Sequence, residues 1–125
     1  MNHLDTSFLI LALARGSRED QRLRAWLRTG EELGMSAIGW AEFLCGPVDS
    51  PALELAGRIV GEPVAFTAAD AVLAARLFDD TGRRRGSLAD CMIAATAIQA
   101  GASLATANSR DFARFAGAGL ALAGT

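Results

Sequence analysis

Hydrophobic residues along the chain fall into short apolar runs that alternate with longer stretches of helical periodicity. Such alternation is typical of an α/β domain built on a mostly parallel sheet. The run nearest the end of the chain is expected to form an edge strand. The predicted strands are Asn2 to Leu4, Met35 to Ile38, Pro63 to Phe66, Ser103 to Thr106 and Leu120 to Leu122.

Helices are predicted between these strands from periodicity and from residues that begin or end helices. Ser17 is suited to cap one helix, and Gly30 is suited to end it. The segment that begins at Leu88 has almost no polar face, which predicts a buried helix. The predicted helices are Ser7 to Ala14, Arg18 to Thr29, Trp40 to Cys45, Pro51 to Val60, Ala68 to Asp80, Leu88 to Ala100 and Asp111 to Phe115.

We expect residues 1–125 to form a single domain, because the chain contains no repeat, linker or low-complexity stretch. The predicted architecture is one α/β/α domain with a central sheet of about four to five strands. A content of 51% hydrophobic and 21% charged residues excludes a disordered chain.

A cytoplasmic protein without membrane association is predicted. No apolar run is long enough to span a bilayer, and the first residues lack the features of a secretory signal. Cys45 and Cys91 stand in apolar surroundings, so we expect both to be small core residues in a reducing compartment.

Several reaction classes are excluded by residues that the chain lacks. It has no lysine, which excludes a phosphate loop of the GxxxxGKS type and Schiff-base chemistry. His3 is the single histidine, so an HExxH zinc site cannot form, and neither a GxSxG nor a GxGxxG motif occurs. The net charge is −2, so binding to nucleic acid would require a local basic patch.

Polar residues with ligand oxygens recur where predicted strands turn into helices. Asp5 follows the first strand, Glu42 the second, and Asn108 and Asp111 the fourth, while Asp90 begins the buried helix. Because the carboxyl ends of parallel strands share one edge of a sheet, we expect these side chains to converge. Gathered carboxylates repel one another and a divalent cation relieves the repulsion, so this oxygen-only set predicts Mg²⁺ or Mn²⁺.

Taken singly, these residues also fit structural roles at helix N-termini. Asp5 and Asn108 can cap helices, and Asp111 would lie favourably at the positive end of a helix dipole. Ser87 and Asp90 are spaced like a capping box, with aspartate in place of glutamate. Capping fits Asp90 least, because an unpaired carboxylate buried in an apolar helix is costly.

Four segments of the chain match a known family in their order and spacing. They are Leu4-Asp5-Thr6-Ser7, Ser36 to Phe43, Gly86 to Ala97 and Thr106 to Phe112. In these segments the chain resembles the PIN-domain ribonucleases, and among them the VapC toxins of bacterial toxin–antitoxin pairs. The resemblance extends over nearly the whole chain. It implies the PIN fold and a metal-dependent endoribonuclease toxin that hydrolyses phosphodiester bonds of tRNA, rRNA or mRNA with metal-activated water.

The resemblance also implies a ligand set. Asp5, Glu42 and Asp90 match the acidic metal site of the family, with Asp5 and Asp90 as direct ligands and Glu42 as a ligand or the holder of a metal-bound water. Many members carry aspartate where this chain has Asn108. The amide would serve at this fourth position, or Asp111 would take it, and the loss of one negative charge bears on whether a second metal binds.

Three of the hydroxyl residues in these segments are expected near the acids: Thr6, Ser87 and Thr106. They are expected either to orient water and the carboxylates or to cap helices. Contacts with RNA phosphates are expected from Arg83, Arg84 and Arg85, which precede the buried helix, and from Arg110. The alternative for these arginines is a solvated surface.

Partners are implied by the resemblance. VapC-like toxins form homodimers and bind a small cognate VapB-type antitoxin that blocks the site. Apolar residues of the first two helices either face such an antitoxin or belong to the core; they are Phe8, Leu9, Leu13, Leu23, Trp26 and Leu27.

Other functions remain as alternatives. The main one is a catalytically silent PIN-like domain that binds RNA or a partner, which Asn108 favours and the retained Glu42 and Asp90 disfavour. A phospho-receiver domain would need a lysine, and a flap-type nuclease would need helical arches for which the chain has no room.

Overall fold

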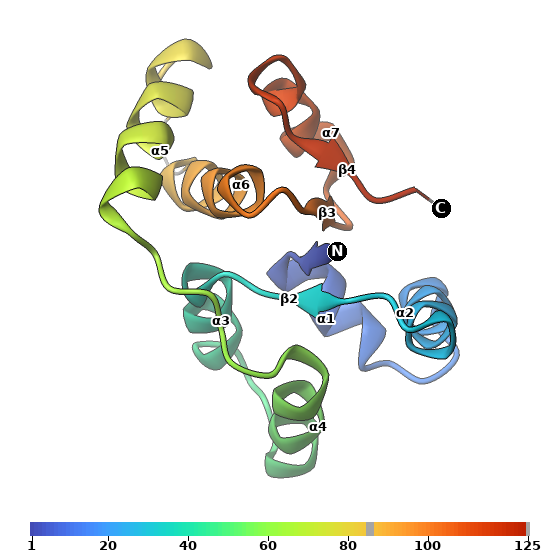
Figure 1. Cartoon of the computed structure of the whole chain (residues 1–125). Helices are drawn as coiled ribbons and strands as arrows, with labels where there is room; N and C mark the ends of the chain where they lie inside the picture. Colours follow the sequence, from blue (N-terminus) through green and yellow to red (C-terminus); the bar gives the residue numbers. More distant parts are fainter. Residues whose placement is uncertain (85–86, 125) are drawn as a thin grey trace.

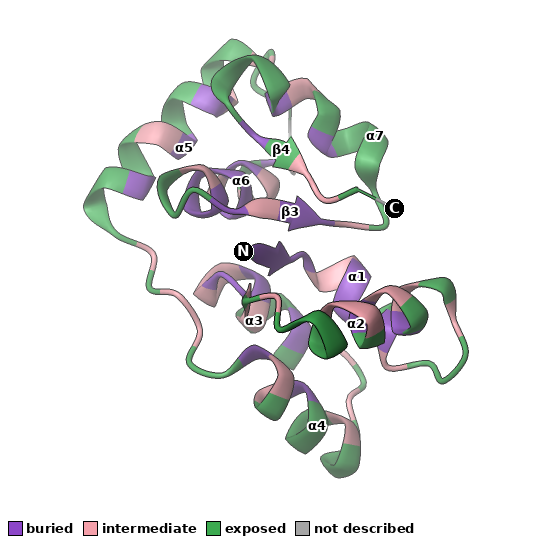
Figure 2. Cartoon of the chain, turned by 45° about the vertical axis from the view of Figure 1, so that its right-hand side comes forward, coloured by how far each residue is buried: buried purple, intermediate pink, exposed green. Residues whose placement is uncertain are grey.

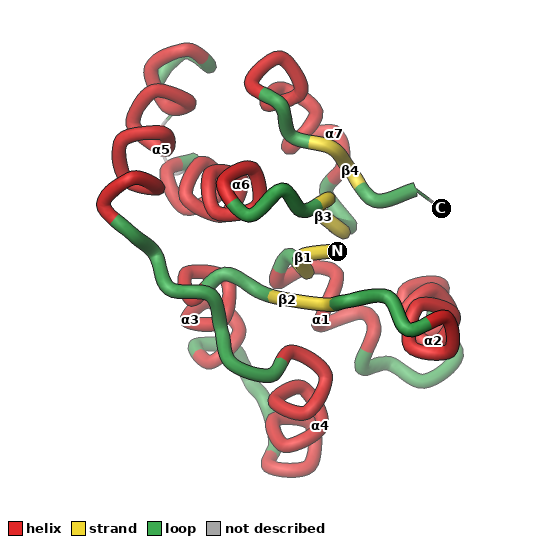
Figure 3. The backbone as a smooth tube through the Cα atoms, in the orientation of Figure 1, coloured by secondary structure: helices red, strands yellow, loops and turns green. Residues whose placement is uncertain are grey.

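A parallel sheet of four short strands organises the part of the chain that the structure describes, residues 1–84 and 87–124 of a computed structural model. The strand order is β2-β1-β3-β4, so β4 is the edge strand that was predicted near the end of the chain (Figure 3). Asn2 of β1 pairs with Leu33 on one side and Ser103 on the other. The strands are β1 Asn2–Leu4, β2 Leu33–Gly34, β3 Ser103–Ala105 and β4 Ala121–Leu122.

Helices surround the sheet in two groups. Figures 1 and 2 show α5, α6 and α7 gathered around β3 and β4, whereas α1 to α4 lie around β1 and β2. The predicted α/β class with a parallel sheet is confirmed. The helices are α1 Thr6–Ala12, α2 Arg18–Thr29, α3 Ala37–Leu44, α4 Ser50–Val60, α5 Ala68–Asp80, α6 Leu88–Gln99, α7 Ser109–Phe112 and the 3₁₀ helix η1 Ala113–Ala118.

The hydrophobic core has two parts, one for each group of helices. The first is centred on α6, where Cys91 and Ile93 are buried against Leu104 of β3 and Phe115 of η1. The second collects Leu4 and side chains of α1 to α4. Figure 2 shows α6 and β1 as largely buried. The prediction of a buried helix is therefore confirmed, although Leu88 at its first turn is exposed.

Local signals fix some elements to the residue. The predicted bounds of α2 and α5 are confirmed. Ser17 accepts a hydrogen bond from the Asp20 N–H at the start of α2, and Gly30 ends it with a left-handed φ of 75°. Gly30 can adopt this φ because it has no Cβ.

Two predicted strands are wrong. The strand expected over Met35 to Ile38 is β2 at Leu33–Gly34 instead, because Ser36 caps α3 by accepting from the Ile38 N–H. The strand expected over Pro63 to Phe66 is reduced to a single bridge between Val64 and Ser36. Proline has no N–H to donate to a ladder, which shortens pairing on this side.

Other expectations near the surface also change. Cys45 is exposed, so only Cys91 is the core cysteine that was predicted. The segment after β3 forms α7 and then η1, rather than one helix over Asp111 to Phe115. In the described residues, no helix is long and apolar enough to cross a membrane.

Candidate active site

Asp5 lies at the carboxyl end of β1 and is held there by hydroxyl groups. Its side chain is buried, with 4% of the residue exposed. Its Oδ2 accepts hydrogen bonds of 2.7 Å from Ser7 Oγ and of 2.7 Å from Thr106 Oγ1. Thr106 follows β3, and the Asp5 N–H donates to Ala105 O at 2.9 Å. The ends of the two central strands therefore meet at this carboxylate, as predicted for a parallel sheet.

Glu42 reaches the same edge from α3. Thr6 Oγ1 lies 3.0 Å from Glu42 Oε1 and 2.9 Å from Gly39 O, so its one proton is directed to two acceptors across α1 and α3. Gly39 allows this approach, because a Cβ there would lie 3.3 Å from Met35 Cε and 3.5 Å from Thr6 Oγ1. Glu42 is exposed and lies in the second turn of α3, not in the first turn as expected.

Asp90 lies in the first turn of the buried helix α6, and 34% of its side chain is exposed. Burial raises the pKa of this carboxyl above its ordinary value, and the negative charges of Asp5, Glu42 and Asp111 raise it further, against the opposing charge of Arg114. The three acids are therefore close enough to Asp90 for their charges to act on it.

The capping alternatives do not hold for the residues at N-cap positions. Asp5, Ser87 and Asn108 occupy the N-caps of α1, α6 and α7, yet none makes a side-chain capping hydrogen bond. Ser87 Oγ instead donates to Arg84 O at 2.7 Å, so it orients the preceding turn and not Asp90. Asp111 lies in the first turn of α7, where the dipole favours it.

Asn108 is tied to the site through its backbone. Its N–H donates to Thr106 Oγ1 at 2.9 Å, so one hydroxyl links Asn108 to Asp5. The amide side chain is exposed, as is Asp111. Both candidates for the fourth position are thus accessible at the edge of the site.

Arg114 is a charged neighbour of Asp90 that was not predicted from the sequence. Its Nη2 lies 3.7 Å from Asp90 Oδ2, and 16% of the side chain is exposed. The guanidinium carbon lies 4.6 Å from the ring centre of Phe115, and Nε and Nη2 are buried without a hydrogen-bond partner among the described residues. The only signal in the sequence was an arginine placed between the buried Phe112 and Phe115.

Comparison with known proteins identifies the family of the chain. A model of the PIN domain family matches residues 3–118. The chain belongs to the PIN domain family. The resemblance that was drawn from the four segments is confirmed at this level. Among curated proteins, no match is found.

Solved structures share the fold of this PIN domain. A chain of VapBC2 from Rickettsia felis, bound to a promoter DNA fragment, has a TM-score of 0.78 and 22% identity over 98% of this chain and 96% of that chain. FitAcB from Neisseria gonorrhoeae has a TM-score of 0.72 and 24% identity, over 99% of this chain and 97% of that chain. A chain of a toxin–antitoxin complex from Klebsiella pneumoniae has a TM-score of 0.70 and 26% identity, over 90% of this chain and 91% of that chain. The whole PIN domain is therefore aligned with proteins of similar length.

The donors of this PIN domain suit a hard divalent cation in their chemistry. All are carboxylate, amide or hydroxyl oxygens, and the hydrogen bonds among the described residues engage Oδ2 of Asp5 but not Oδ1. In the described part of the chain, no three acidic, histidine or cysteine side chains stand close enough to form a complete metal site. A cation held here would therefore keep water among its ligands, which is usual for Mg²⁺.

The arginines expected to contact RNA are in different situations. Arg83 pairs with Asp79 and lies over the ring of Phe78 at 5.3 Å, so its charge is already partly matched. Arg84 and Arg110 are exposed. Arg85 lies outside the described residues. Their contact with RNA stays a prediction.

Proposed function

We propose that this PIN domain is a metal-dependent endoribonuclease and the toxin of a toxin–antitoxin pair. The observation that carries the proposal is the carboxylate cluster of Asp5, Glu42 and Asp90. These acids come from separate parts of the chain, and burial of Asp90, followed by repulsion from Asp5 and Glu42, raises the pKa of Asp90. A protein keeps such a repulsive group where a function requires it. Membership of the PIN domain family also supports nuclease activity.

In this proposal Asp5 and Asp90 bind Mg²⁺ or Mn²⁺ directly, and Glu42 binds the ion or one of its waters. The bound ion would supply Lewis acidity and a more acidic water for attack on a phosphodiester. Ser7 and Thr106 fix the carboxylate of Asp5 by donating to one of its oxygens. Thr6 does the same for Glu42. These hydroxyls orient the acids as the supporting groups of a metal site do.

An antitoxin is the proposed partner. Complexes named VapBC and FitAB share this fold. An apolar cavity of about 280 Å³ opens between α1 and the α3–α4 segment, lined by Ile10, Leu13, Phe43 and Val48 among others. Ile10 and Leu27 are exposed, whereas Phe8, Leu9 and Leu23 belong to the core. An amphipathic antitoxin segment would cover this apolar surface. The homodimer and the cytoplasmic location stay predictions.

A catalytically silent PIN-like domain is the second candidate. Asn108 favours it, because an amide supplies no negative charge where many family members carry aspartate. Arg114 favours it too, since a cation 3.7 Å from Asp90 partly neutralises the cluster. Such a protein would bind RNA or a partner without cutting.

The test is cleavage of total cellular RNA by the purified, antitoxin-free protein with Mn²⁺ and with EDTA. Asp5→Asn and Asp90→Asn retain the shapes of the side chains, and Glu54→Gln is the matched control because Glu54 is an exposed acid of α4 paired with Arg58. We expect discrete fragments with Mn²⁺ from the wild type and from Glu54→Gln, and intact RNA from the other samples. RNA left intact by a folded wild type in Mn²⁺ would favour the silent domain.

A further inference from the structure

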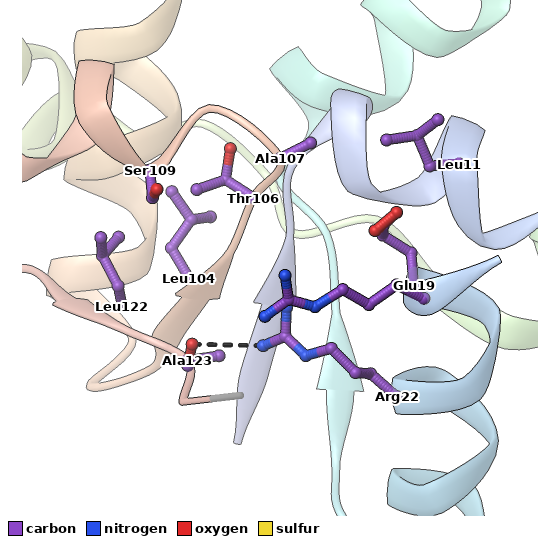
Figure 4. A pocket seen from close by; sticks show the side chains of 10 residues that line it. Leu11, Glu19, Arg22, Leu104, Thr106, Ala107, Ser109, Leu122 and Ala123 are labelled. Atoms are coloured by element: carbon purple, nitrogen blue, oxygen red, sulfur yellow. Dashed lines mark hydrogen bonds between the residues drawn. The ribbon is translucent and has the colours of Figure 1, made fainter.

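A cavity of about 350 Å³ lies beside the carboxylate cluster, between α2 and the strands β3 and β4. Arg18, Glu19 and Arg22 line it from α2, and Thr106 and Ser109 line it from the segment after β3. Figure 4 shows Arg22 extending from α2 towards β4, with Thr106 and Ser109 on the facing wall. Its volume falls within the usual range of small-ligand sites.

Arg22 is fixed in this cavity by contacts on several sides. Its guanidinium carbon lies 5.3 Å from the ring centre of Phe8 and 5.1 Å from that of Trp26. Nη2 donates to the carbonyls of Ala123 at 3.2 Å and Gly124 at 2.6 Å (Figure 4 shows the first). These hydrogen bonds use only Nη2 of the three guanidinium nitrogens. A preorganised guanidinium loses little entropy when it binds a ligand.

The cavity carries an excess of positive charge. Two guanidinium groups, those of Arg18 and Arg22, face one carboxylate, that of Glu19. Among the described residues, neither arginine forms a salt bridge. Arg18 lies close enough that its charge lowers the pKa of Arg22, after the larger effect of burial. The protein has a net charge of −2, so binding to nucleic acid requires a local basic patch, and this cavity provides one.

Thr106 connects this cavity to the carboxylate cluster. It lines the cavity, and its Oγ1 donates to Asp5 Oδ2 at 2.7 Å. A ligand that occupied both the carboxylate cluster and the cavity would place its reacting group near Asp5 and a negative group near Arg18 and Arg22. These two groups of the ligand would have to lie close together. A phosphodiester chain has this property, because each nucleotide carries one phosphate. Ser109 adds a hydroxyl that can donate to a phosphate oxygen, whereas the proton of Thr106 is already donated to Asp5.

We propose that this cavity binds a phosphate of the RNA strand next to the bond that is cut, with Arg18 as the main contact and Arg22 as the fixed floor. The identity of the ligand rests on the proposed function, whereas the anion site rests on the cavity itself. Arg18 and Arg22 would thus add to the RNA contacts that stay predicted for Arg83, Arg84, Arg85 and Arg110.

The experiment measures binding of a fluorescein-labelled single-stranded RNA of mixed sequence in EDTA, where metal-dependent cleavage cannot occur. Arg18→Gln removes one charge from an exposed side chain, so the fold should be retained. Arg18→Lys keeps the charge, and Arg28→Gln removes an exposed charge from the same helix outside the cavity. Each variant is titrated at two salt concentrations, and its melting temperature checks that it is folded.

We expect Arg18→Gln to weaken RNA binding about 5- to 10-fold at low salt and to lower the salt slope by about 0.7, the share of one phosphate contact on a single strand. Arg18→Lys should bind within about threefold of the wild type, because a phosphate accepts either cation. Arg28→Gln should bind as the wild type does.

Unchanged binding by Arg18→Gln, or an equal loss in Arg28→Gln, would overturn the inference, as would a wild type that does not bind the RNA. Weakened capture of the cognate antitoxin by Arg18→Gln, with RNA binding intact, would assign the cavity to an acidic peptide instead. Cleavage is scored separately with Mn²⁺. RNA that is bound through Arg18 but never cut would refute the nuclease and leave the anion site standing.

Discussion

Arg114 Nη2 lies 3.7 Å from Asp90 Oδ2, so a partly buried cation of the 3₁₀ helix faces a carboxyl whose pKa is raised by burial and by the neighbouring acids. The distance is too long for a hydrogen bond, and Nε and Nη2 find no other partner among the described residues. The pair therefore acts through charge. Arg114 is the positive charge that partly offsets the carboxylates when no metal ion is bound.

Arg114→Gln should tighten the binding of Mn²⁺, because the substitution removes a positive charge that repels the incoming ion. We expect the dissociation constant to fall about 3- to 10-fold. Electron paramagnetic resonance of free Mn²⁺ measures this directly. Arg28→Gln, which removes an exposed charge of α2, is the control and should leave the constant unchanged. Weaker binding by Arg114→Gln would mean that Arg114 supports Asp90 instead of competing with the ion.

Asp90→Asn should stabilise the metal-free protein at neutral pH. The pKa of Asp90 is raised in the folded state, so the ionised carboxylate destabilises the fold above that pKa. The penalty shrinks as the pH falls through the raised pKa and is lost below 3.8, the ordinary pKa, where the group is protonated in both states. Because the side chain is partly exposed, the gain should be about 1 kcal/mol or less. Urea unfolding in EDTA at pH 7 and near pH 4 gives the comparison, and a gain equal at both values would exclude charge as the cause.

How far the sequence predicts this protein depends on whether the signal is local. The bounds of α2 and α5 follow from caps such as Ser17 and Gly30, which act within a few residues. Asp5 and Glu42 could be selected because each follows a predicted strand, and Asp90 because it begins a helix that was predicted to be buried. The position of β2 could not be predicted, because Ser36 caps α3 and the apolar residues after it belong to that helix.

Arg114 and Arg18 show a different limit. Each looks like an ordinary surface arginine in the sequence, and its role depends on elements far away in the chain. Arg114 matters because η1 packs its side chain near Asp90 of α6. Arg18 matters because α2 lies across a cavity from Thr106. No periodicity or motif encodes such neighbours, whereas the triple arginine at Arg83, Arg84 and Arg85 is conspicuous for its composition alone.

His3 should make the protein less stable in mild acid. The residue is 1% exposed in β1, and neither ring nitrogen has a hydrogen-bond partner among the described residues. Burial, and then the positive charge of the N-terminus, lower the pKa of His3. The unfolded chain therefore takes up a proton below about pH 6.5 that the folded protein resists, and stability falls as the pH drops from there.

His3→Leu should flatten this dependence between about pH 7.5 and pH 5.5, where histidine is the ordinary titrating group. Gly34 leaves space for the ring, since a Cβ there would be 3.1 Å from His3 Cδ2, and leucine, which has about the volume of histidine, should be tolerated. Urea midpoints of both proteins at the two pH values provide the measurement. A wild type equally stable at both would show that the buried ring is protonated without cost.

Thr106→Val should impair metal binding more than it impairs folding. Valine keeps the shape but removes the proton donated to Asp5 Oδ2 and the oxygen that accepts from the Asn108 N–H. A lost supporting group of this kind weakens metal binding about 10- to 100-fold, and the unmade hydrogen bonds cost about 1 to 3 kcal/mol of stability. Thr106→Ser retains the hydroxyl and should restore both properties. Mn²⁺ titration and urea unfolding of the two variants separate the effects. If Thr106→Val loses stability but binds Mn²⁺ as the wild type does, the hydroxyl serves the fold alone, and Asp5 is oriented by Ser7.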